Sequence, residues 1–117
     1  MGLQWVRMDT QWPSNPKFLA LIADGKWRAI AVYWGALGWS GMHGLDGFVD
    51  PICLPAIHAT KRNCEELVAA RLWQPVEGGW VIPDYREFQL STEELAERSK
   101  KAKMAASVRW HTENGKG

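Results

Sequence analysis

The side chains that most often carry catalysis are few in this sequence and are scattered along it. The three histidines, His43, His58 and His111, have no carboxylate at a spacing that would pair with them. The sequence also lacks a glycine-rich phosphate loop, a paired-histidine motif and a nucleophile elbow. Asp46 and Asp50 flank a turn, a pattern more typical of hairpins than of metal sites. We therefore expect a protein that is not an enzyme.

A zinc site is the one metal centre that the residue types suggest. Cys53, His58 and Cys64 could supply three ligands, and a fourth would have to come from His43 or His111. Structural zinc sites use four ligands in paired short spacings, whereas these spacings are irregular. We therefore expect no metal and no cofactor, and we interpret the two cysteines as buried, reduced thiols.

Phosphate binding is the chemistry for which the sequence is best equipped. The net charge is only +1, but residues 1–90 carry eight Lys and Arg against nine Asp and Glu, whereas residues 91–117 carry six against four. Five of these bases lie in a stretch without any acid: Arg98, Lys100, Lys101, Lys103 and Arg109. Such a segment predicts salt-dependent contacts with the phosphates of double-stranded DNA. The alternative is a solvated face whose cations favour the negative end of a helix.

A second group of polar residues precedes a predicted helix over 64–72. Lys61, Arg62 and Asn63 lie in the expected turn and have side chains suited to reading base edges. Two outward glutamates, Glu65 and Glu66, would repel phosphates there. Acids in the first turn of a helix stabilise its dipole, which explains Glu65 and Glu66 without DNA. Asn63 and Glu66 also have the spacing of a capping box, which marks the start of the helix. We predict that residues 61–63 reach a DNA groove.

The elements that must position these residues can be predicted from periodicity and turn signals. We expect helices over 16–23, 26–39, 54–59 and 64–72, a short strand at 48–49 and a hairpin formed by 72–76 and 80–82. An extended segment over 84–90 and a basic helix from 91 complete the order. It predicts an α+β, mainly α fold, namely a winged helix-turn-helix with a short three-stranded β-sheet and an added basic C-terminal helix. We divide the chain into a winged-helix domain (1–90), the basic helix (91–112) and a disordered tail (113–117).

Length and composition restrict the protein class. A chain of 117 residues with 46% hydrophobic and 23% charged residues suits one small globular domain. The nearly uncharged stretch 29–45 is too short and too rich in glycine to span a bilayer, and the N-terminus has no secretory pattern. We therefore expect no membrane partner and a cytoplasmic location. Of the eight tryptophans we assign seven to the core and leave Trp110 outside it.

Several short motifs resemble those of a known group of proteins. They are Trp5 to Asp9, Asn15-Pro16-Lys17, Asp46-Gly47, Leu72-Trp73, and Ile82 to Tyr85 with Gln89. Over residues 3–111 the chain is similar to small winged-helix proteins of actinobacterial phages and prophages and to the N-terminal domains of DnaD-like phage replication initiators. The resemblance implies a non-catalytic DNA-binding protein acting in replication initiation or transcription regulation. The alternative hypothesis is an interaction module that binds a host or phage protein, or a second copy of itself as a homodimer.

Overall fold

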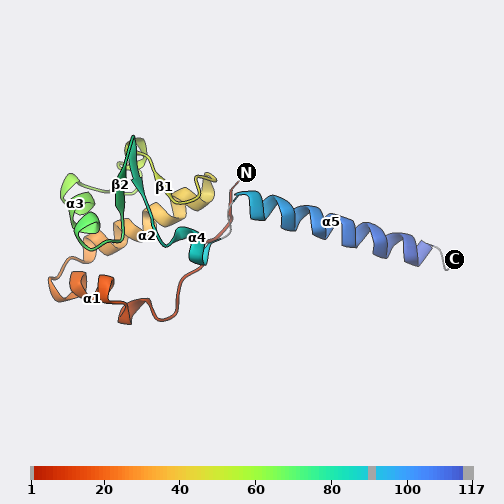
Figure 1. Cartoon of the computed structure of the whole chain (residues 1–117), viewed down its shortest axis with the longest axis horizontal. Coiled ribbons are helices and arrows are strands. Elements are labelled where there is room, and N and C mark those ends of the chain that lie inside the picture. The colour runs from red at the N-terminus through yellow and green to blue at the C-terminus, as the bar shows by residue number, and fades with distance from the viewer. Residues whose placement is uncertain (1, 90–91, 115–117) are drawn as a thin grey trace.

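The computed structural model of the protein describes residues 2–89 and 92–114, with Glu87, Phe88, Thr92 and residues 105–114 described by their backbone alone. The fold is α+β and mainly helical, as predicted, with one small antiparallel sheet (Figure 1). Its helices are α1 (Pro16–Ala23), α2 (Trp27–Met42), α3 (Lys61–Ala69), α4 (Tyr85–Phe88) and α5 (Thr92–Asn114), with 3-10 turns η1 (Trp12–Ser14) and η2 (Pro51–Cys53). The strands are β1 (Phe48–Val49), β2 (Gln74–Val76) and β3 (Gly79–Val81).

The core is built around α2, which is covered on most sides. Phe18 of α1 packs against Tyr33 of α2 with ring centroids 5.1 Å apart, and Trp12 and Trp34 extend this aromatic cluster. Leu67 of α3 is fully buried in the same core. Because α2 contacts α1, α3 and β1, it is the element on which the other elements are arranged.

The sheet has the order β1-β3-β2, with both pairs antiparallel. Val76 pairs with Gly79 across the hairpin, so Glu77 and Gly78 form its two-residue turn. Gly78 has a φ of +83°, the positive value that a type II turn requires at its second central residue and that favours glycine there. The predicted hairpin is confirmed, although β2 begins two residues late, because the amides of Leu72 and Trp73 still donate to the carbonyl oxygen of Leu67 in α3.

Three helices end in the same hydrogen-bonded motif. After α1 and α2 the left-handed position is filled by glycine, Gly25 and Gly44, whereas after α3 it is filled by Arg71 with a φ of +65°. In each case the residue after this position donates its amide to a carbonyl five residues earlier, such as Leu72 to Leu67 at 3.0 Å. The α3 terminus therefore places a non-glycine residue where glycine is favoured.

The prediction that seven tryptophans lie in the core is wrong for two of them. Trp5 is 77% exposed and Trp27 is 58% exposed, because Trp5 lies on an N-terminal arm (residues 3–8) and Trp27 is the first residue of α2. Trp73 is buried, and four others, Trp12, Trp34, Trp39 and Trp80, are partly buried against the core. The side chain of Trp110 lies outside the described part of the chain.

Three predicted elements also differ. The expected helix over 54–59 is absent, because the chain instead forms η2 and a turn in which His58 adopts a φ of +58°. The segment expected to be extended over 84–90 contains the single turn α4. The basic helix is present as α5, but it continues through residues 113 and 114, which were assigned to the disordered tail; residues 115–117 lie outside the described chain.

The C-terminal helix projects away from the rest of the molecule (Figure 1). The body, which we define as residues 2–89, holds the sheet and α1 to α4, whereas α5 extends from the end opposite α3. The overall dimensions are 66 × 31 × 20 Å, and α5, with 23 residues, accounts for about 34 Å of helix at 1.5 Å per residue.

Candidate nucleic-acid interface

The start of α3 differs from the prediction, and the difference changes the role of Asn63. Thr60 is the N-cap, its Oγ1 accepts from the amide of Asn63 at 3.1 Å, and Oδ1 of Asn63 accepts from the amide of Thr60 at 3.1 Å. The Asn63 amide nitrogen Nδ2 also donates to Glu66 at 3.2 Å. Asn63 is only 4% exposed. We therefore assign Asn63 to the capping box within the helix, not to a turn before it, and leave it out of the DNA contacts.

Glu66 does not face outward as predicted. Its side chain accepts from Asn63 and lies 4.0 Å from Nζ of Lys26, which extends from the segment between α1 and α2. Glu65 is exposed, as predicted. The negative surface expected on α3 is therefore reduced to one glutamate.

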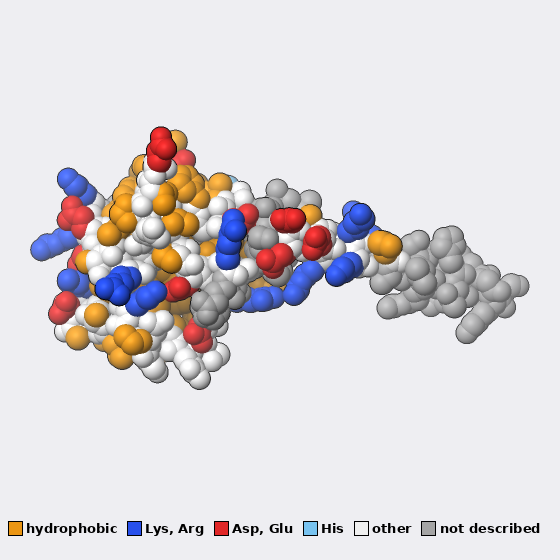
Figure 2. All heavy atoms as spheres, viewed as in Figure 1, with side chains coloured by type: hydrophobic (Ala, Val, Ile, Leu, Met, Phe, Trp, Pro, Cys, Tyr) orange, Lys and Arg blue, Asp and Glu red, His pale blue; other side chains and the backbone are white. Residues whose placement is uncertain are grey.

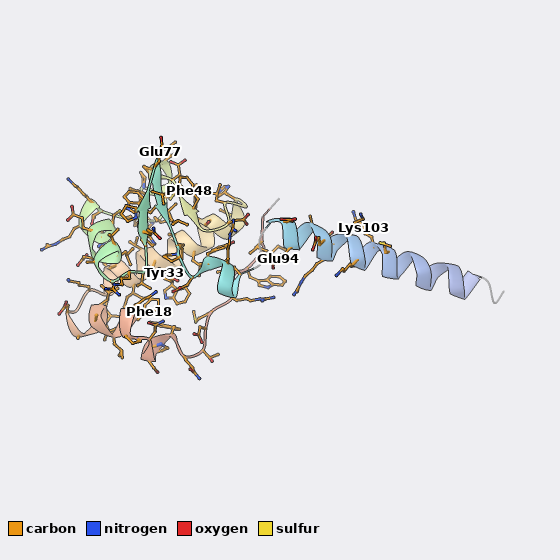
Figure 3. All side chains as sticks on the ribbon, viewed as in Figure 1. Phe18, Tyr33, Phe48, Glu77, Glu94 and Lys103 are labelled. Atoms are coloured by element: carbon orange, nitrogen blue, oxygen red, sulfur yellow. The ribbon has the colours of Figure 1, made fainter. Side chains whose placement is uncertain are left out.

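Lys61 and Arg62 are exposed on the first turn of α3, and Lys61, with Glu65, lines a hollow whose other walls are mostly apolar. This hollow of about 400 Å³ lies between α3 and the hairpin, and its walls include Val68, Pro75 and Trp80. The hairpin tip carries Glu77 and no base (Figure 3). The face formed by α3 and the hairpin therefore offers little positive charge to a DNA groove.

The basic side chains of α5 have a different environment. Arg98, Lys100, Lys101 and Lys103 are all exposed. The ion pairs found among the described side chains join Lys17 to Asp84 and Lys26 to Asp24 and Glu66, so they all lie in the body. The four described cations of α5 are therefore available to a ligand, and Figure 2 shows Lys and Arg side chains both beside and beyond the acidic side chains of the helix. Arg109 lies in α5, but its side chain is outside the described set.

Helical spacing divides these cations between two sides of α5. Arg98 and Lys101 are three residues apart and share one side. Lys100 and Lys103 have the same spacing and, at about 100° per residue, share the opposite side. The face between the two sides carries Ser99 and Ala102, which are small and exposed. An exposed helix with cations on both flanks and small side chains between them is the arrangement that a nucleic-acid groove would accommodate.

Gln89 holds the chain at the point where it leaves the body. Its Oε1 accepts from the amide of Arg7 at 2.7 Å, and its Nε2 donates to the carbonyl oxygen of Arg7 at 2.6 Å. Gln89 is only 5% exposed. The N-terminal arm is held in turn by the amide of Leu3, which donates to the carbonyl oxygen of Gly41 at 2.8 Å. Local sequence analysis missed this role of Gln89, because its partner lies 82 residues away.

The two predicted groups of site residues do not form one surface. The start of α3, with Lys61 and Arg62, lies at one end of the long axis, and α5 extends from the other end (Figure 1). Any ligand that both groups contact would have to span the body. We therefore treat α5 as the candidate interface.

The described residues show little that would support metal or thiol chemistry. Cys53 and Cys64 are free and buried, and burial raises the pKa of both thiols. No three histidine, cysteine or carboxylate side chains come together in a way that could hold a metal ion within the described chain. In that same part of the chain, no helix has the length and apolar character needed to cross a bilayer.

Comparison with protein families, curated proteins and solved structures finds no match to this chain.

Proposed function

We propose that this protein binds double-stranded DNA without catalysing a reaction, and that α5 is its main contact. The proposal rests on the exposed cations of α5, which projects from the body. These cations lie on two flanks of the helix, and none of them forms an ion pair with a described carboxylate. The major groove of B-DNA is about 12 Å wide and accepts one α-helix. A helix lying there has phosphates on both sides, so that Arg98 and Lys101 would contact one strand and Lys100 and Lys103 the other.

We also propose that the body is a winged helix-turn-helix domain. The order α2, β1, η2, α3, β2 and β3 supports this, as does a sheet in which the strand before α3 pairs with the second strand of the hairpin. In that fold α3 would be the helix presented to DNA. Because its exposed cations Lys61 and Arg62 are accompanied by Glu65, and Lys61 lies beside a mostly apolar hollow, we propose that α3 makes at most a secondary contact.

The proposed contacts are to phosphates, and phosphate contacts carry no sequence information. We therefore expect binding that depends strongly on salt and weakly on sequence. Four phosphate contacts correspond to a slope of about −3.6 for the logarithm of the binding constant against the logarithm of the salt concentration. An additional contact from Arg109 would make this slope steeper.

Fluorescence anisotropy with a labelled random-sequence duplex tests the proposal. The first variant combines Lys100→Gln, Lys101→Gln and Lys103→Gln, which remove three charges at little cost in helix propensity. The matched control combines Lys61→Gln, Arg62→Gln and Arg71→Gln, which remove three exposed charges from the body. We expect the α5 variant to bind more weakly, with its salt slope reduced by about 2.7, and the control to change the slope by less than about 1, because α3 makes at most a secondary contact. Equal losses in the two variants would contradict the assignment to α5.

A further inference from the structure

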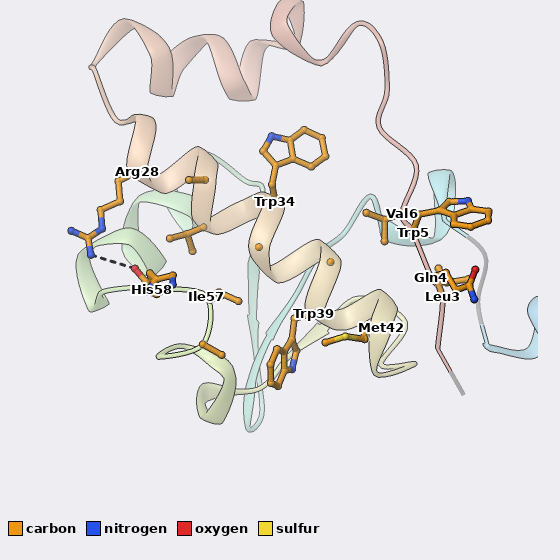
Figure 4. A pocket seen from close by; sticks show the side chains of 15 residues that line it. Leu3, Gln4, Trp5, Val6, Arg28, Trp34, Trp39, Met42, Ile57 and His58 are labelled. Carbon is orange, nitrogen blue, oxygen red and sulfur yellow. Dashed lines mark hydrogen bonds between the residues drawn. The ribbon is translucent and has the colours of Figure 1, made fainter.

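An apolar groove runs along the face of α2 that α1 and α3 leave open. Its volume is about 850 Å³, and its floor is formed by Ala31, Gly35, Gly38 and Met42, which recur on one side of the helix. Trp34 and Trp39 stand on the two sides of this floor (Figure 4). We call this feature the α2 groove.

The two ends of the groove differ in character. At one end the N-terminal arm contributes Leu3 and Val6, and at the other end lies Arg28 (Figure 4). Nη2 of Arg28 donates to the carbonyl oxygen of His58 at 3.4 Å, a long bond that leaves most donors of the guanidinium group unused. The groove is therefore apolar along its length and cationic at one end.

The floor of the groove is open at its centre. A Cβ atom added at Gly38 would meet no atom within 4 Å, whereas one added at Gly35 would lie 3.2 Å from Cβ of Ile57. From Ala31 to Met42 the floor extends over about 16 Å, or three helical turns, at 1.5 Å per residue. Large apolar side chains at i, i+4, i+7 and i+11 of a second helix would match this length, and one of them would enter the open space above Gly38.

Charge decides which helix fits. Arg28 is the one charged residue that lines the groove within the described chain, and no carboxylate lines it. A second copy of α5 carries carboxylates at Glu93, Glu94 and Glu97, but it lacks a stripe of large apolar side chains, because Leu95 is followed at the spacing of the floor by Ser99, Ala102 and Ala106. A second copy of α2 could not supply a carboxylate for Arg28, because no acidic residue lines its groove. The complementary occupant is therefore a helix that carries an acidic residue beyond its apolar side chains.

We propose that the α2 groove binds an amphipathic helix of a partner protein, one of whose apolar side chains lies over Gly38 and whose carboxylate pairs with Arg28. The bidentate geometry of guanidinium and carboxylate groups suits such a contact. This inference is independent of DNA binding, because the groove lies on the body and uses none of the α5 cations.

The probe is a synthetic helical peptide with leucine at i, i+4, i+7 and i+11 and one glutamate a turn beyond each end of this stripe. A second peptide has lysine in place of both glutamates. Two end positions are used because the direction of the bound helix is then unimportant. Binding of each labelled peptide to the full chain is measured by fluorescence anisotropy, and the oligomeric state of the free protein is measured by light scattering.

We expect the chain to bind the glutamate peptide about three- to five-fold more tightly than the lysine peptide, as for a solvent-exposed ion pair. Arg28→Glu should reverse this preference. Gly38→Leu, which fills the open floor, should weaken binding of both peptides at least tenfold. Ala20→Leu, the same kind of change on the exposed side of α1, should leave binding unchanged.

Three results would overturn the proposal. The first is that the glutamate peptide does not bind the folded chain, or that it binds the Gly38→Leu variant with the same affinity as the unmodified protein. The second is an unchanged preference between peptides in Arg28→Glu, which would show that Arg28 is not at the contact. The third is a free protein that is dimeric and becomes monomeric in Gly38→Leu, because the groove would then be filled by a second copy. Circular dichroism confirms that each variant is folded before its binding is compared.

Discussion

Replacement of Asn63 by alanine separates its structural role from a role in DNA binding. The substitution removes the acceptor for the Thr60 amide and the donor to Glu66, at 3.1 and 3.2 Å. Loss of a capping interaction costs about 1 kcal/mol, and loss of a partly buried hydrogen bond to a charged group costs about another 1 kcal/mol. Since Thr60 is exposed and water can replace part of its bond, we expect a total loss of about 1–2 kcal/mol in the free energy of unfolding.

Urea denaturation followed by circular dichroism measures this loss, which corresponds to a fall of roughly 4–8 °C in Tm. Thr60→Ala removes the other half of the capping box and should cost about 1 kcal/mol. Arg62→Ala, on the exposed side of the same turn, should change stability by less than about 0.5 kcal/mol. DNA affinity of Asn63→Ala, measured well below its Tm, should equal that of the unmodified chain. Unchanged stability together with weakened DNA binding would refute the capping assignment.

Three further predictions concern stability. Arg71→Gly should raise the free energy of unfolding by about 1 kcal/mol, because it places glycine at the left-handed end of α3 as at the ends of α1 and α2; lower stability in urea denaturation would contradict this. Gly38→Ala should raise it by about 0.5–1 kcal/mol, because the new Cβ meets no atom and alanine favours the helix, and an unchanged Tm would count against that reasoning. Burial, with a smaller contribution from Asp84, raises the pKa of Tyr33 from 10.0 to about 12. The unfolded tyrosine therefore ionises first, and Tyr33 should contribute a fall in stability of about 2 kcal/mol between pH 10 and 12, so that denaturation curves of Tyr33→Phe at the two pH values should show a fall smaller by that amount.

Local signals in the sequence were sufficient for the elements whose boundaries depend on neighbouring residues. The helix at 16–23 follows Asn15, whose Oδ1 accepts from the amide of Lys17 at 2.9 Å, and the hairpin turns at Gly78. Both features are set by one capping or turn residue. For the same reason the α+β class and the position of the short sheet were predictable.

Features that depend on distant contacts were not predictable in this way. Thr60 and Asn63 are both suitable N-caps, and the local sequence does not decide which of the two begins the helix. Trp5 and Trp27 have the residue type of a core position, but Trp5 lies on the N-terminal arm and Trp27 at the first residue of α2, and only tertiary contacts decide whether such positions are covered.

The candidate site was predicted in part. The sequence identified the basic stretch of α5, and the structure adds that four of its side chains are exposed and divided between two flanks. The sequence did not indicate that Lys61 and Arg62, at the start of α3, lie at the far end of the molecule from α5 (Figure 1). The α2 groove was also missed, because small residues within an apolar helix are typical of a helix that other elements cover on all sides.

The most direct test of the central claim is the salt dependence of duplex binding by the unmodified chain. Anisotropy titrations of a random-sequence duplex across a series of salt concentrations give the slope of the logarithm of the binding constant. We predict measurable binding at low salt and a slope of about −3.6 or steeper, from four described phosphate contacts on α5. Absence of binding at low salt, or a slope near zero, would contradict DNA binding by α5.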